Sequence, residues 1–147
     1  MNRIFIIPLI SFLLVSLYAA PSFTQQNEEN TPASLHTAVS DGDIEKVKSI
    51  LSSGVDVNAR NRINRTPLHT AVDRQRKEIV QLLLEKNADV NSVDNNRQTP
   101  LHMAVSTGQK DIVELLIAKG ADVNAVDAMT ENALSLAQRR GDKEWPN

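Results

Sequence analysis

The sequence predicts an all-α repeat solenoid built from stacked helix-turn-helix units. Leucine and alanine recur with a period of 33 residues, and no insertion breaks the register. The same period relates two strings, Thr-Pro-Leu-His and Asp-Val-Asn, in successive units. Such self-similarity is typical of repeat architectures, whose units are stabilised by packing on their neighbours. The recurring positions are Leu35, Leu68, Leu101 and Leu134, with Ala38, Ala71, Ala104 and Ala137.

The first helix of a unit has a clear start. Thr66 is a favourable N-cap, and Pro67 suits the first helical position, where a missing N–H costs no hydrogen bond. Thr99 and Pro100 repeat this pair one period later. We expect a short helix through residues 68–72, with small alanines that allow a neighbour to approach closely.

The second helix of a unit is apolar on too many sides to face a single partner. In the second unit its apolar residues lie between Ile79 and Leu84, so we expect it to be sandwiched between neighbours. Gly54, Asn87 and Gly120 follow these helices, where a left-handed backbone favours glycine or asparagine. The Asp-Val-Asn strings should then form projecting turns into the next unit.

These strings resemble the ankyrin repeat. The resemblance rests on TPLHTA, TPLHMA, EIVQLLLEKNADVN and DIVELLIAKGADVNA, and it covers residues 33–144. It implies stacked helix-turn-helix units with short β-hairpin tips, in a curved solenoid that binds other proteins on its concave side. It divides an ankyrin repeat domain over residues 33–147 into units 33–65, 66–98 and 99–131 and a partial unit 132–147.

The two terminal units depart from the pattern. Lys46, Lys48 and Ser49 narrow the apolar stripe of the first unit, as an N-terminal capping unit requires. The last unit lacks a second helix, so the third unit should be covered by one further helix only. We expect either Trp145 to fold over this edge or an apolar patch to stay open and promote association. A functional end and a premature end of the chain fit this pattern equally well.

The N-terminus has the order of a signal peptide. One basic residue, Arg3, precedes an apolar run over residues 4–18 and a group of small residues. We predict a signal peptide over residues 1–22 and a polar linker over residues 23–32. An uncleaved anchor over residues 4–23 is the alternative, because about 20 apolar residues suffice to span a membrane. Either form is expected to leave the cytoplasm, as a periplasmic or secreted protein or as a membrane-anchored one.

Composition and motifs argue against an enzyme. The chain has no cysteine, which excludes disulfides, thiolate metal sites and a cysteine nucleophile. It contains no Gly-x-Ser-x-Gly elbow, no His-Glu-x-x-His string and no glycine-rich phosphate loop. Asp56, Asp89 and Asp122 recur at the tips, where we expect them to accept backbone hydrogen bonds rather than to act as acid and base. We expect no catalytic residue and no cofactor.

Three histidines recur in register and are the candidate metal ligands, namely His36, His69 and His102. Packed helices lie about 8–10 Å apart. Residues on equivalent faces therefore cannot share one zinc ion, whose ligand bonds are about 2 Å long. We expect no metal site. The family resemblance implies instead that each imidazole forms hydrogen bonds with backbone around its turn.

Charge points to a binding surface. Residues 59–77 hold six basic residues and one acidic residue, although the whole chain has a net charge of -2. The resemblance places this segment on a tip and at the inner end of a first helix, along the binding groove. Arginine suits an interface because its planar guanidinium pairs with a carboxylate at two points. The candidate partner-binding residues are Arg60, Arg62, Arg65, Asp73, Arg74, Asn95, Asn96, Ser106 and Thr107. A solvated tip, kept soluble by its charge, is the alternative interpretation.

The expected function is non-enzymatic protein–protein interaction outside the cytoplasm. A membrane-tethered or self-associating scaffold that uses the incomplete C-terminal edge is the alternative. Nucleic acid is not an expected partner, because single-strand binders need aromatic stacking platforms and Trp145 is the only aromatic residue beyond the leader.

The tips lack the glycine that the family usually has in its hairpin turn. Asn64, Arg97 and Thr130 stand at this position. Asparagine tolerates a positive φ, whereas arginine and threonine adopt one at a greater cost. The sequence therefore leaves the conformation of the last two tips open.

Overall fold

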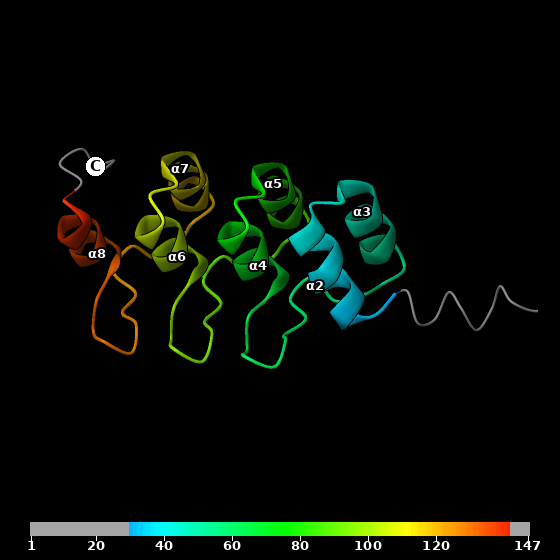
Figure 1. Ribbon diagram of the computed structural model, residues 1–147, viewed down its shortest axis with the longest axis horizontal. Helices are drawn as coiled ribbons and strands as arrows, with labels where there is room; N and C mark the ends of the chain where they lie inside the picture. The colour runs from blue at the N-terminus through cyan, green and yellow to red at the C-terminus, as the bar shows by residue number, and fades with distance from the viewer. Residues whose placement is uncertain (1–29, 142–147) are drawn as a thin grey trace, which may run out of the picture.

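The computed structural model describes residues 30–141, which form a row of stacked helix pairs (Figure 1). First helices lie in one layer, second helices in another, and loops project from the first layer. The helices are α2 (Pro32–Asp41), α3 (Ile44–Ser52), α4 (Pro67–Asp73), α5 (Lys77–Glu85), α6 (Pro100–Ser106), α7 (Lys110–Ala118) and α8 (Ala133–Arg140). This arrangement confirms the predicted all-α solenoid.

The described residues exclude the expected signal peptide, the alternative anchor over residues 4–23 and Trp145. Among the helices of residues 30–141, none has the length and hydropathy of a transmembrane segment. The first of them, α2, is capped by Thr31 and begins at Pro32, so the last residue of the expected linker is helical.

The core is one continuous cluster of aliphatic side chains that runs through the stack. Leu35, Leu68 and Leu101 are 0%, 0% and 1% exposed. The second helix α5 packs on α4 in its own unit and on both α3 and α7. It is therefore sandwiched, as its apolar residues on several sides predict.

The first unit has the narrow apolar stripe that its sequence predicts. Val47 and Ile50 of α3 are buried, and Leu51 is partly buried. Lys46 and Lys48, on the same helix, are exposed. Because this polar face ends the row, the first unit needs no preceding neighbour.

The C-terminal end of the row is apolar. Leu134 occupies the position of Leu68 and Leu101, yet it is 51% exposed, because no helix follows α8 within the described residues. Ile117 of α7 is only partly buried, whereas its counterpart Leu84 is 7% exposed. We call Ile117 and Leu134 the C-terminal edge.

Polar side chains of one unit also cap first helices of the preceding unit. Arg76 donates to the carbonyl oxygen of Ser40 at 3.1 Å, and Arg140 donates to that of Ser106 at 2.7 Å. Gln109 donates to a carbonyl near the end of α4 at 3.0 Å. Carbonyls at a helix end have no intrahelical partner, and a cation there also opposes the helix dipole. Directional hydrogen bonds therefore join successive units in addition to apolar packing.

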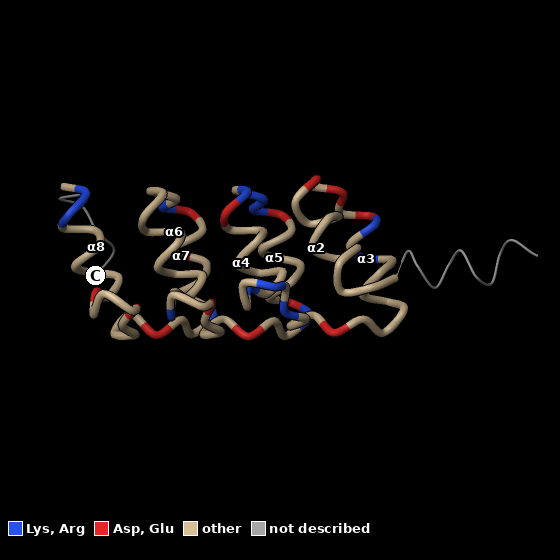
Figure 2. Tube along the Cα trace, turned by 60° about the horizontal axis from the view of Figure 1, so that its bottom comes forward, with Lys and Arg blue, Asp and Glu red and all other residues tan. Residues whose placement is uncertain are grey.

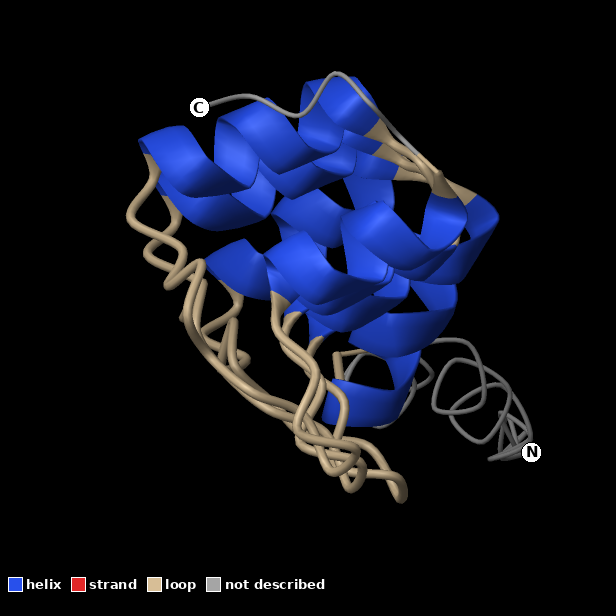
Figure 3. Ribbon diagram, turned by 90° about the vertical axis from the view of Figure 1, so that its left-hand side faces the viewer, coloured by secondary structure: helices blue, strands red, loops and turns tan. Residues whose placement is uncertain are grey.

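The tips are tight loops, so the predicted β-hairpins are wrong. Figure 3 shows helices and loops only, and no strand occurs within residues 30–141. Backbone bonds close all three tips, from Asn61 N to Arg65 O, from Asp94 N to Gln98 O and from Asp127 N to Glu131 O, each at 3.0 Å. The Asp94 carboxylate then accepts from the backbone N–H groups of Asn96 and Gln98. The Asp94 side chain thus accepts backbone N–H groups that would otherwise be available for the hydrogen bonds of a β-hairpin.

All three tips share one backbone conformation despite their different residues. Asn64, Arg97 and Thr130 have φ values of 62°, 57° and 61°. The left-handed region costs arginine and threonine more than asparagine. The backbone bonds of each tip, and the N–H groups that donate to the side chain of Asn61, Asp94 or Asp127, must therefore offset this cost.

The three histidines join each unit to the following tip. Nε2 of His36, His69 and His102 lies 2.9–3.1 Å from the carbonyl oxygens of Ala59, Gln98 and Glu131, respectively. Nδ1 of His69 accepts from the backbone N–H of Thr66 at 3.2 Å, which places the ring proton on Nε2. The backbone role implied for these imidazoles is confirmed.

Burial disfavours the charged imidazolium and lowers the pKa of both His36 and His69 below the ordinary 6.5. The unfolded chain therefore binds more protons than the folded chain once the pH falls below 6.5. Stability supplied by neutral histidine is complete above this pH and decreases as the pH falls toward the folded-state pKa.

We predict that the thermal midpoint falls as the pH drops from neutral to about 5. A His69→Ser variant isolates the contribution of one imidazole, because Ser135 fills the equivalent position in the last unit and bonds to its N-cap. Because the variant loses the hydrogen bond to Gln98, its free energy of unfolding should be about 1–3 kcal/mol lower at neutral pH. That free energy should also depend less steeply on pH. Calorimetry of both proteins over this pH range measures the thermal midpoint. Equal slopes of the midpoint against pH would contradict a role of neutral His69 in stability.

Candidate protein-binding surface

The candidate residues lie in two rows that follow the stack. One row comprises the tips, and the other comprises the C-terminal ends of α4 and α6. The period of 33 relates Arg62 to Asn95 in the tips, and it relates residues 73–74 to 106–107 at the helix ends. The candidates therefore come from equivalent positions of adjacent units.

Arg62 is the most available cation of the first tip. It is exposed, and its side chain forms no hydrogen bond or ion pair within residues 30–141. Arg60 differs, because its Nη1 donates to the carbonyl oxygens of Asn64 and Val93 at 3.0 and 2.7 Å. Arg60 thus joins the first tip to the second, whereas Arg62 faces solvent.

Arg65 lies between the tips and the helix ends. Its guanidinium is 3.4 Å from a carboxylate oxygen of Asp94 and 3.7 Å from one of Asp73. The Asp94 side chain is only 3% exposed, so this contact serves the fold. A buried carboxylate that loses its cation is strongly destabilised. Arg65 therefore positions the second tip and shapes the surface between the rows.

The end of α4 presents one acid and one base. Asp73 is 43% exposed and lies 3.9 Å from Nε of Arg74. The Arg74 side chain is 58% exposed. An exposed pair at this distance contributes little to stability, so Arg74 can exchange Asp73 for a carboxylate of a partner.

The candidates of the next unit are polar and uncharged. Asn95 and Asn96 are exposed on the second tip, and their side-chain amides make no hydrogen bond within the described part of the chain. At the end of α6, the hydroxyl of Thr107 donates to the carbonyl oxygen of Met103 at 2.7 Å, while Ser106 is exposed. The predicted contact residues therefore change from charged to uncharged along the row.

Not all of the basic segment belongs to this surface. Figure 2 shows basic residues gathered around the second unit, both at the tip before α4 and beyond the end of that helix. Arg76 caps α2, as described above, and Lys77 pairs with Asp111 at 2.6 Å. Of the six bases counted in residues 59–77, only Arg62 and Arg74 lack a structural role.

The sequence interpretation missed several exposed residues on the tips. Ile63, Val93, Val126 and Met129 are 49%, 38%, 40% and 74% exposed. Arg97 is also exposed, and its side chain has no partner within residues 30–141. Alignment by the 33-residue period could have revealed them, because Ile63 and Met129 occupy the position at which the second tip has a polar asparagine.

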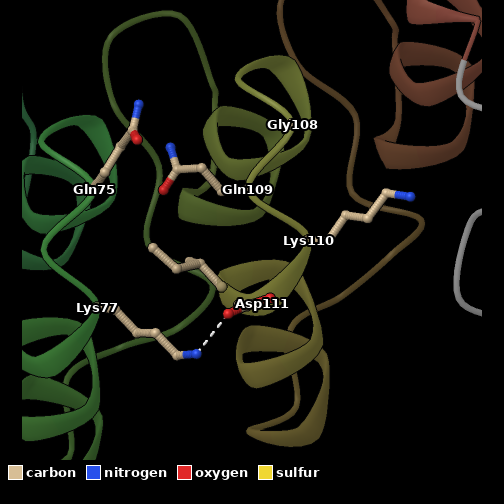
Figure 4. Close-up of a pocket in the computed structure, with 7 residues that line it drawn as sticks. Gln75, Lys77, Gly108, Gln109, Lys110 and Asp111 are labelled. Carbon is tan, nitrogen blue, oxygen red and sulfur yellow. Dashed lines mark hydrogen bonds and ion pairs between the residues drawn. The ribbon is translucent and has the colours of Figure 1, made fainter.

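A shallow cavity of about 420 Å³ lies between the second and third units, away from the tips (Figure 4). It is lined by Gln75, Lys77 and residues 108–112. The hydrogen bond and charge of Asp111 raise the pKa of Lys77, and Lys77 lowers the pKa of Asp111. Neither shift brings a group toward neutral pH, and the lining holds no hydroxyl, thiol or imidazole, so nothing in it resembles a nucleophile with its base.

The repeated acidic residues have structural partners. Carboxylates of Asp56, Asp89 and Asp122 each accept from the backbone N–H two residues later, at 2.8–3.0 Å. Within residues 30–141 no group of three potential ligands is placed to hold a metal ion. The tip aspartates thus act as turn acceptors.

The comparisons agree with this geometry. The family model described as ankyrin repeats (3 copies) matches residues 35–127, more than half of the chain. No curated protein matches the sequence. Ankyrin repeat domains are typically non-catalytic modules that bind other proteins. With its period, its helix pairs and its histidine bonds, the chain belongs to the ankyrin repeat family.

Proposed function

We propose that this chain binds a partner protein through its concave surface, with Arg62 and Arg74 as the charged contacts, after export from the cytoplasm. The observation that carries the proposal is the exposure of these two cations without a required role in the fold. Arg65 and Asp73 lie between them, and the polar candidates of the second tip and of the end of α6 extend the surface along the row. No catalytic step is proposed.

We predict that Arg62→Glu combined with Arg74→Ala weakens partner binding by about tenfold or more, because arginines are frequent interface hot spots. The free energy of unfolding should change by less than about 0.5 kcal/mol, since both side chains are exposed. Immobilised variants would capture partners from extracts of the producing cells, with the bound protein quantified by mass spectrometry.

Lys110→Glu combined with Lys86→Ala is the matched control. It makes the same change in charge at the C-cap of α5 and the first residue of α7, away from the apices of the tips, and both lysines are exposed. Control binding should equal that of the wild type. Undiminished binding by the Arg62 and Arg74 variant would rule out this surface. Arg65 is unsuitable for such a test, because its reversal would place a second acid beside buried Asp94.

Export is the second part of the proposal, and it is supported by the order of charge, apolar run and small residues in the first 22 positions. We predict that N-terminal sequencing of the protein from an extracytoplasmic fraction finds a mature chain that begins at Ala20 or Phe23. An intact Met1 in the membrane fraction would support the anchored alternative instead. An intact chain confined to the soluble cytoplasmic fraction would refute export.

The C-terminal edge favours a second candidate, a scaffold that associates with itself. Leu134 is 51% exposed where its counterparts are buried. An exposed leucine at the end of the row is the kind of apolar surface that promotes association.

For this candidate we predict a mass that rises with concentration in analytical ultracentrifugation. Leu134→Glu should return the protein to a monomer, because a carboxylate would have to be desolvated in the contact. Its thermal midpoint should change little, since the side chain is half exposed. A monomer over a wide concentration range would eliminate this candidate and leave the binding module unaffected.

A further inference from the structure

We infer that the row of tips binds an acidic polypeptide segment that carries large apolar side chains. The inference rests on the proposed function and narrows the chemistry of its partner. The contact surface, which we call the tip ridge, consists of Arg62, Ile63, Val93, Arg97, Val126 and Met129. It differs from the helix ends, where Arg74 lies.

The tip ridge is held in a fixed shape before any partner binds. Backbone bonds join successive tips, from Asn95 N to Ile63 O at 3.3 Å and from Ala128 N to Asn96 O at 2.9 Å. Arg60 adds a bond to the carbonyl oxygen of Val93. Because little backbone freedom remains to be lost, a partner would bind these loops at a low entropic cost.

The exposed charge at the apices of the tips, residues 61–65, 94–98 and 127–131, is positive, whereas the exposed aspartates Asp56, Asp89 and Asp122 lie earlier in each loop, nearer the second helices. Asp94 and Asp127 are 5% and 4% exposed, and their carboxylates accept backbone N–H groups of their own loops. Glu131 pairs with Arg139 at 3.0 Å. The side chains of Arg62 and Arg97 are exposed and unpaired within the described residues. A partner with carboxylates therefore complements the tip ridge electrostatically.

Apolar side chains are interspersed with these cations. Ile63 directly follows Arg62, and Val93 lies against the first tip, since Asn64 and Arg60 both approach its carbonyl oxygen. Met129, at 74% exposed, is the most open large apolar side chain of the described residues. Aliphatic contacts of this kind suit leucine, isoleucine or phenylalanine on a partner, with methionine able to adapt its shape.

Other polyanions fit less well. Residues 30–141 contain no aromatic side chain on which nucleic acid bases could stack. Two unpaired arginines would contribute only about 1 kcal/mol each at an anionic membrane. A polypeptide can supply both carboxylates for the arginines of the ridge and apolar side chains for its aliphatic residues.

The test measures binding of the full-length chain to an array of synthetic peptides in which glutamate alternates with leucine or phenylalanine. Matched peptides carry lysine for glutamate or serine for the apolar residue. Binding should require both chemistries and weaken with salt. Vesicles of phosphatidylserine and phosphatidylcholine and a mixed-sequence oligonucleotide complete the set. Failure of every acidic-apolar peptide, or a preference for vesicles or the oligonucleotide, would overturn the inference.

The repeats supply variants that preserve the fold. Arg62→Asn with Ile63→Asn gives the first tip the apex of the second, and Arg97→Asn introduces the residue that holds the same left-handed position in the first tip. The triple variant should bind the peptides about tenfold more weakly, with an unchanged thermal midpoint. Full peptide binding by this variant would overturn the inference. If capture of a partner from extracts depends on Arg62 and Arg74 but no acidic-apolar peptide binds, the proposed function stands while the inference fails.

Discussion

The structure depends on each unit being completed by the next. A pair of helices with seven to ten residues each has no core of its own, and it gains one only by stacking. The contrast between Leu101, 1% exposed, and Leu134, 51% exposed, measures this dependence within one chain. The imidazole of His69 extends it to polar groups, because its ring joins the cap of one helix to the following tip. Tips and helices are therefore held in a fixed relation, which a binding surface composed of both requires.

Features that every unit repeats could be predicted from sequence. Helix starts, the sandwiched second helices and the capping character of the first unit depend on local caps and apolar spacing, which are visible in a single period. The β-hairpin tips could not, because the outcome depends on competition for backbone donors. The carboxylates of Asp94 and Asp127 accept these backbone N–H groups, and the tips close as loops.

The candidate surface was only partly predictable, because arginine has several uses that a sequence does not distinguish. Arg62 faces solvent, Arg65 pairs with a buried carboxylate, and Arg76 caps the preceding unit. These roles depend on contacts across units, about 30 residues away in the chain. The exposed apolar residues of the tips could not be predicted for the same reason, since their exposure depends on how the loops fold rather than on the composition of the loops.

Burial also decides which charges a partner meets. The chain has a net charge of -2, yet the apices of the tips expose cations, because Asp94 and Asp127 are buried and hold their loops. The same carboxylates thus stabilise the backbone and remove negative charge from the outer surface. A substitution of Asp94 would therefore act on two levels, since it would release Arg65 and open the second tip together. The fold and the surface charge are coupled here through a single buried side chain, so the net charge of the chain does not describe the charge that its tips expose.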